Sequence, residues 1–175
     1  MTKTILLSSS GLKNITLNKY KEEEDFIIAF GSQKFRMKSI FAEFISPIIS
    51  HLHQSDPTIH EIQFNDIISD KKIDFEGFSP NNILTNDIIS LFLQISSGYS
   101  IEINHDQATK MRFLSILLGN SELFDKLNEN FPLNFSEENL TVYLKNIQSF
   151  YFISQLSPSF DYVELINFIS KHFNS

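Results

Sequence analysis

Residues 35–52, FRMKSIFAEFISPIISHL, constrain the fold more than any other stretch of the chain. Their apolar residues follow the i, i+3, i+4, i+7 spacing of one helical face, which predicts a surface that must be buried. Pro47 interrupts this face, because proline lacks a backbone N–H and its ring clashes with the preceding helical turn. Ser46 is a favourable N-cap, and proline is favoured at the first helical position. The stretch therefore predicts two short helices that meet at Ser46.

Strand patterns lie on both sides of these helices. Residues 25–30 (DFIIAF) and 34–37 (KFRM) flank the turn residues 31–33 (GSQ), which is typical of a β-hairpin. After the helices, a turn signal at residues 55–57 (SDP) precedes residues 61–64 (EIQF), where apolar and polar residues alternate. We expect this alternation to form a third, half-exposed strand, so that the strands make a small three-stranded sheet.

Helical patterns return further along the chain. The polar residues 65–82 are predicted to form a loop, and helical spacing resumes over residues 84–95. Residues 111–118 are apolar nearly all round, which indicates a helix buried on most sides. Gly119 should end that helix, and Ser121 should cap a short one after it. This order of elements predicts an α+β fold in which a small three-stranded sheet is capped by a cluster of α-helices.

The two ends of the chain are predicted to be appendages. Residues 1–24 hold short apolar clusters separated by serines and an asparagine, so they form either a loose arm or an added edge strand. Residues 134–173 predict two additional C-terminal helices, the first capped by Ser136 and the second beginning at Asp161. Two amphipathic helices cannot bury their faces alone. We therefore expect this pair to pack on the preceding helices or on a second subunit.

Composition excludes several classes of function. The chain has 175 residues and a formal charge of −7, which argues against a nucleic-acid partner. It has no cysteine, so disulfides and thiolate sites are excluded. There is no signal-peptide core and no uncharged apolar stretch of about 18 residues, the length that suggests a membrane span. We expect a cytoplasmic or nuclear protein that has no membrane partner.

The central stretch resembles the BTB/POZ domain, whose members read F-x-x-H-x-x-(apolar)-L-x-x-x-S-P-x-F after a strand, a turn and a strand. Phe35 holds the opening aromatic position, Phe41 the apolar position, and residues 46–47 the Ser-Pro pair. Lys38 and Ala42 stand where the family has histidine and leucine. The resemblance covers about residues 25–127, and the segment 134–173 resembles the start of the BACK region that often follows BTB/POZ domains.

The resemblance implies an interaction module that forms a homodimer through its first helix and N-terminal strand. It also implies that a cullin-type ubiquitin ligase is a partner, for which the chain would be an adaptor. Independently, the apolar faces of the hairpin and first helix exceed what a small monomeric core needs. The residues expected at the interface with another subunit or protein are Phe26, Met37, Phe41, Phe44 and Ile48.

Two other hypotheses stay open. One is a small metal-dependent enzyme that uses the only dense cluster of potential ligands, His51, His53, Asp56 and His60. Against it, residues i and i+2 of a helix point about 200° apart, so His51 and His53 would not converge easily. No nucleophile, phosphate-binding or dinucleotide motif occurs, and we predict neither enzymatic activity nor a cofactor. The other hypothesis is a monomeric scaffold subunit, as in the Skp-like and elongin-like relatives of this fold.

Overall fold

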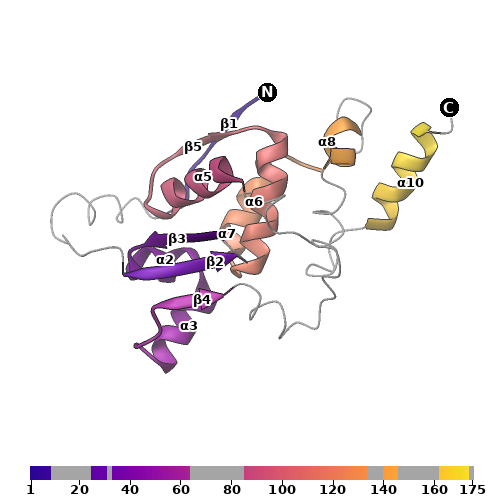
Figure 1. Cartoon of the computed structure of the whole chain (residues 1–175). Helices are drawn as coiled ribbons and strands as arrows, with labels where there is room; N and C mark the ends of the chain where they lie inside the picture. Colours follow the sequence, from indigo (N-terminus) through magenta and orange to yellow (C-terminus); the bar gives the residue numbers. More distant parts are fainter. Residues whose placement is uncertain (9–24, 31–32, 64–84, 134–139, 146–161, 174–175) are drawn as a thin grey trace.

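A computed structural model describes residues 1–8, 25–30, 33–63, 85–133, 140–145 and 162–173 (Figure 1). Within these residues the fold is α+β, with seven helices, one two-stranded sheet and one three-stranded sheet. The α+β prediction is therefore confirmed, while the second sheet was not expected. No helix in the described part of the chain is long and apolar enough to cross a bilayer.

The three-stranded sheet has the order β3-β2-β4. Strands β2 (Phe26–Phe30) and β3 (Gln33–Met37) form the predicted antiparallel hairpin, with Ile28 opposite Phe35. Strand β4 (Glu61–Gln63) runs parallel to β2 on its other side, with Ile62 opposite Ile28. A parallel pair needs a crossover connection, and here the helix pair supplies it. The third strand is confirmed at residues 61–63, and Phe64 lies outside the described residues.

The helix pair breaks where the sequence predicts. Helix α2 (Ser39–Ile45) ends and helix α3 (Pro47–Ser55) begins on either side of Ser46, whose backbone is extended. The Ser46 hydroxyl accepts a hydrogen bond from the backbone N–H of Ile49 at 3.2 Å, as an N-cap does. The same hydroxyl donates to the carbonyl of Leu118 at 2.9 Å. The junction is therefore anchored to a distant part of the chain as well as capped.

A second sheet joins the N-terminus to the middle of the chain. Strand β1 (Lys3–Ile5) pairs antiparallel with β5 (Ile101–Ile103), and Ile5 and Ile103 are both buried in the core. Of the two alternatives for residues 1–24, an edge strand is present over residues 3–5. Residues 9–24 lie outside the described part of the chain.

Three further helices contribute buried residues to the core. Helix α5 (Asn86–Ser96) is followed, after β5, by α6 (His105–Leu117) and α7 (Ser121–Asn130). The side chain of Asn104 and that of Gln107 form a reciprocal capping box at the start of α6. Asn120, and not Ser121 as predicted, caps α7 by accepting from the backbone of Leu123. Gly119 between these helices has a φ of +70°, which glycine adopts without strain.

The C-terminal helices extend the same core. Helices α8 (Leu140–Lys145) and α10 (Tyr162–Phe173) lie beyond α6 and α7, on the side away from the three-stranded sheet (Figure 1). Tyr143 on α8 and Leu165 on α10 are buried and belong to the core cluster that also contains the strands and the other helices. This agrees with packing on the preceding helices. The predicted caps Ser136 and Asp161 lie outside the described residues.

One charged side chain lies deep in this core. Arg112 on α6 is 0% exposed, and its Nε donates to the side chain of Asn128 at 2.8 Å. Its Nη2 donates to the carbonyls of Leu127 and Phe131, so the cation caps the C-terminal end of α7, where carbonyls lack helical partners. Burial lowers the pKa of Arg112 to about 10, which leaves it charged at neutral pH.

Replacing Ser46 by alanine should destabilise the fold by about 1–2 kcal/mol, because the change removes an N-cap and leaves the buried carbonyl of Leu118 without its donor. The measurement is urea unfolding followed by circular dichroism. Ser55→Ala is the matched control, since the Ser55 hydroxyl is exposed and donates to the carbonyl of His51 in its own helix. Equal stabilities of the two variants would contradict the anchoring role of Ser46.

Candidate functional site

A hollow of about 300 Å³ opens where α2, α3 and the turn before β4 meet. Most of its lining residues carry polar side chains, and all of them fall between residues 25 and 60 of the chain. Two acidic and two histidine side chains reach it. The lining residues are Asp25, Ser39, Glu43, Ser50, His53, Gln54, Pro57 and His60.

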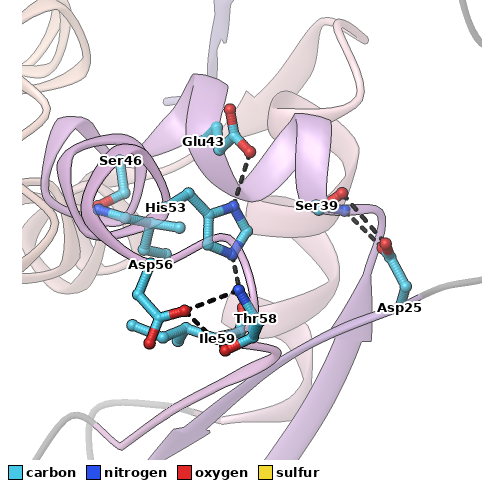
Figure 2. A network of polar contacts seen from close by, with 9 residues as sticks. Asp25, Ser39, Glu43, Ser46, His53, Asp56, Thr58 and Ile59 are labelled. Carbon is cyan, nitrogen blue, oxygen red and sulfur yellow. Dashed lines mark hydrogen bonds and ion pairs between the residues drawn. The ribbon is translucent and has the colours of Figure 1, made fainter.

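Asp25 fixes the start of α2 at one side of the hollow. Its carboxylate accepts from the backbone N–H of Ser39 at 2.8 Å and from the hydroxyl of Ser39 at 3.2 Å (Figure 2). A carboxylate is favoured here because the first N–H groups of a helix lack partners and carry partial positive charge. Since Asp25 immediately precedes β2, these bonds tie the hairpin to the helix pair.

His53 also lines the hollow. Its Nδ1 lies 2.7 Å from Oε1 of Glu43 on α2, and its Nε2 lies 2.6 Å from the carbonyl oxygen of Ile59 (Figure 2). The ring also meets the ring of Phe26 edge-on, with the centroids 5.0 Å apart. One side chain therefore joins α2, α3, the turn before β4 and the first residue of β2.

The surroundings of His53 favour its charged form. A carboxylate and a backbone carbonyl can only accept, so both ring nitrogens must donate for both bonds to form. Burial acts to lower the pKa of His53, but the hydrogen bonds to Glu43 and Ile59, with the negative charges of Glu43 and Asp25, raise it above its ordinary value. The arrangement is a charge-assisted histidine–carboxylate pair at the edge of the hollow.

The turn after α3 brings the Ile59 carbonyl to the ring. Asp56 ends α3, and its Oδ1 accepts from the backbone N–H of Thr58 at 2.9 Å and from the Thr58 hydroxyl at 2.6 Å. These two bonds lower the pKa of the Asp56 carboxyl, and they form an Asx-type turn that reverses the chain. The turn signal in the sequence predicted this reversal, although it gave no indication of the contact with His53.

The structure does not bring together the four residues of the predicted metal site. His51 is exposed on α3, both nitrogens of His53 contact other groups, and Asp56 bonds to Thr58. Among the described residues, no three histidine, aspartate or glutamate side chains lie close enough to hold a metal ion. Only His53 and His60 of the set line the hollow.

The predicted interface residues divide into two groups. Phe26, Met37 and Phe41 are only 0%, 3% and 6% exposed, so they pack inside the chain and are not available to a partner in this conformation. The cause of this burial is that the hairpin and α2 pack on the other helices of the same chain, and the role of these three residues at an interface stays a prediction. Phe44 and Ile48 are half-buried.

Ile40 is the surface residue that this prediction missed. It is 40% exposed on α2, one turn before Phe44. The helical spacing had included Ile40 in the face to be buried, but the buried side of α2 consists of Phe41, Ala42 and Ile45, and Ile40 lies at its margin. Glu43 was missed as well, because its partner His53 lies in a different helix whose direction depends on the break at Ser46.

Replacing Asp25 by alanine should destabilise the chain by about 1 kcal/mol, because the start of α2 loses its carboxylate acceptor. Asp25→Asn retains an acceptor oxygen and should lose less. Thermal unfolding of the three proteins at neutral pH measures the difference. An alanine variant as stable as the wild type would show that the bonds to Ser39 make no net contribution to the free energy of unfolding.

Comparisons of the chain with protein-family models, with curated proteins and with solved structures found no match. The resemblance to the BTB/POZ domain therefore rests on the sequence pattern, and what it implies about partners enters below as a proposal.

Proposed function

We propose that this chain is a non-catalytic protein–protein interaction module, related to the BTB/POZ domain, that pairs with a second copy of itself through the outer face of α2 and α3. The observation that carries the proposal is the exposed side chain of Ile40 beside half-buried Phe44. Residues four apart on a helix share one face, so the two side chains form a continuous apolar surface. Half-buried Ile48 follows on α3, where part of its side chain lies against Gly119 between α6 and α7.

The charge distribution supports this choice of surface. The chain carries 14 basic and 21 acidic side chains, yet residues 39–55 contain no lysine or arginine and only one acid, Glu43. Depletion of charged residues is the compositional feature of interface centres. Two copies brought together through this face would bring few like charges into contact, although the whole chain has a net charge of −7.

The order of elements supports the link to the BTB/POZ domain. A hairpin, a helix pair broken at Ser-Pro, a third strand and three further helices follow one another, as the resemblance implies. The family pairs through its first helix, which corresponds here to α2. A role as adaptor for a cullin-type ligase comes from the resemblance alone, and the polar residues 65–82 lie outside the described part of the chain.

A monomeric scaffold subunit is the second candidate, and one observation favours it. Phe26, Met37 and Phe41 are buried without a partner, and β1 pairs with β5 of its own chain. A single copy of the chain therefore buries these three side chains and forms its second sheet without a second copy. The two candidates differ in the mass of the protein in solution, which sedimentation or light scattering measures directly.

Replacing Ile40 by glutamate should convert a dimer into a monomer and leave the fold intact, because the side chain is exposed and the new charge would face its counterpart across the interface. Sedimentation equilibrium at micromolar concentration measures the mass, and circular dichroism checks the fold. Val163→Glu is the matched control, since Val163 is 67% exposed on α10 and should leave the mass unchanged.

Phe41→Glu should behave differently from Ile40→Glu, because it places an unpaired charge in the core and should unfold the chain. A wild-type protein that is monomeric at every accessible concentration would overturn the self-association and favour the scaffold candidate. Co-purification with a cullin would then be compared between the wild type and the Ile40→Glu variant. Its loss in the variant would show that the same face binds the ligase, and its retention would show that another face does.

A further inference from the structure

The hydrogen-bond geometry of His53 sets a condition on its protonation state. Nδ1 faces the Glu43 carboxylate at 2.7 Å, and Nε2 faces the Ile59 carbonyl at 2.6 Å. A neutral imidazole has one N–H only, so one of these nitrogens would turn a lone pair toward an oxygen. The neutral ring can therefore keep the bond to α2 or the bond to the turn before β4, but not both.

From this geometry we propose that His53 is a proton-dependent clasp, which holds the turn of residues 56–60 and strand β4 against α2 when charged and releases them when neutral. The proposal goes beyond self-association and does not depend on it. It concerns the side of the helix pair that faces the hollow.

The segment that the clasp holds is short. Strand β4 is three residues long, and among the described strands it pairs with β2, where Ile62 is buried and Ile59 before it packs against the core. The N–H of Ile27 donates to the carbonyl of His60 at 2.8 Å, and Lys34 on β3 contacts Glu61 at 2.7 Å on the exposed side. Exposed ion pairs contribute little, so loss of the His53 bond leaves the turn held mainly by its own hydrogen bonds and by the packing of Ile59 and Ile62. Short segments of this kind open locally before the whole protein unfolds.

The groups that face His53 from each neighbouring element determine the direction of the response. Glu43 on α2, Asp25 before β2 and Asp56 at the end of α3 favour the cation, whereas His60 before β4 would oppose it when charged. Together with the hydrogen bonds, the acids outweigh burial, and the pKa of His53 is raised in the folded chain. The stabilisation is therefore complete below the ordinary pKa of histidine, about 6.5, and is lost as the pH rises through the raised value.

Two measurements on the full chain test the clasp. Proton–carbon NMR of the histidine rings follows the titration of His53, which should occur above the ordinary histidine range. Amide hydrogen exchange, corrected for its intrinsic dependence on pH, follows the opening of residues 56–63. We expect their protection to fall several-fold across the same pH interval in which His53 loses its proton, while protection of α6 stays constant.

Variants separate the clasp from a general effect of pH. Glu43→Gln keeps the shape of the partner and removes its charge, so both the titration of His53 and the opening should move to lower pH. His51→Gln, which alters an exposed histidine on the same helix, should leave both unchanged. In the His53→Gln variant, residues 56–63 should open at all pH values. If it does not fold, Glu43→Gln still decides the question.

Three outcomes would overturn the proposal. His53 could titrate at or below the ordinary range for histidine. Protection of residues 56–63 could prove independent of pH in the wild type. Glu43→Gln could leave the titration and the exchange where they are.

Discussion

The break between α2 and α3 at Ser46 is the constraint on which the rest of the molecule depends. Ser46 is 0% exposed, and its hydroxyl both caps α3 and donates to the carbonyl of Leu118. From the other side, the amide of Asn120 donates to the carbonyl of Ile45 at 2.8 Å while its oxygen caps α7. Two side chains therefore satisfy backbone groups at the ends of α2 and α6 and at the starts of α3 and α7, which fixes how the helix pair meets α6 and α7.

Much of the fold could be predicted because most of its elements have a recognisable sequence pattern within a few residues. The hairpin follows from apolar segments on either side of a glycine turn, the helix break from a serine before Pro47, and the strand β4 from alternation over residues 61–63. These features depend on neighbours in the sequence. For the same reason the pattern identified which side chains are apolar, although it could not tell which of them would face solvent.

Features that depend on distant contacts could not be read in this way. The pairing of β1 with β5 joins segments nearly a hundred residues apart. A strand of three residues has too weak a sequence pattern to predict the strand with which it pairs. An arginine such as Arg112 is expected at the surface from its sequence alone. It is buried here because α7 ends beside it, where the carbonyls of Leu127 and Phe131 accept its hydrogen bonds. The contact of His53 with Glu43 requires the helix break and the turn at Asp56 together. The sequence had marked this histidine for metal binding, whereas its packing gives it two acceptors.

The parallel pairing of β2 with β4 has a consequence for the order in which the chain acquires its structure. Residues 31–60 lie between the two strands, so β4 finds its place on β2 only after both helices have formed and the chain has closed a long loop. The hairpin, by contrast, needs only its own turn. We therefore expect folding to begin with β2, β3 and the helix pair, and the sheet to gain its third strand last. A nascent chain that has not yet extended past residue 63 leaves one side of β2 uncovered, open to pairing with a neighbour.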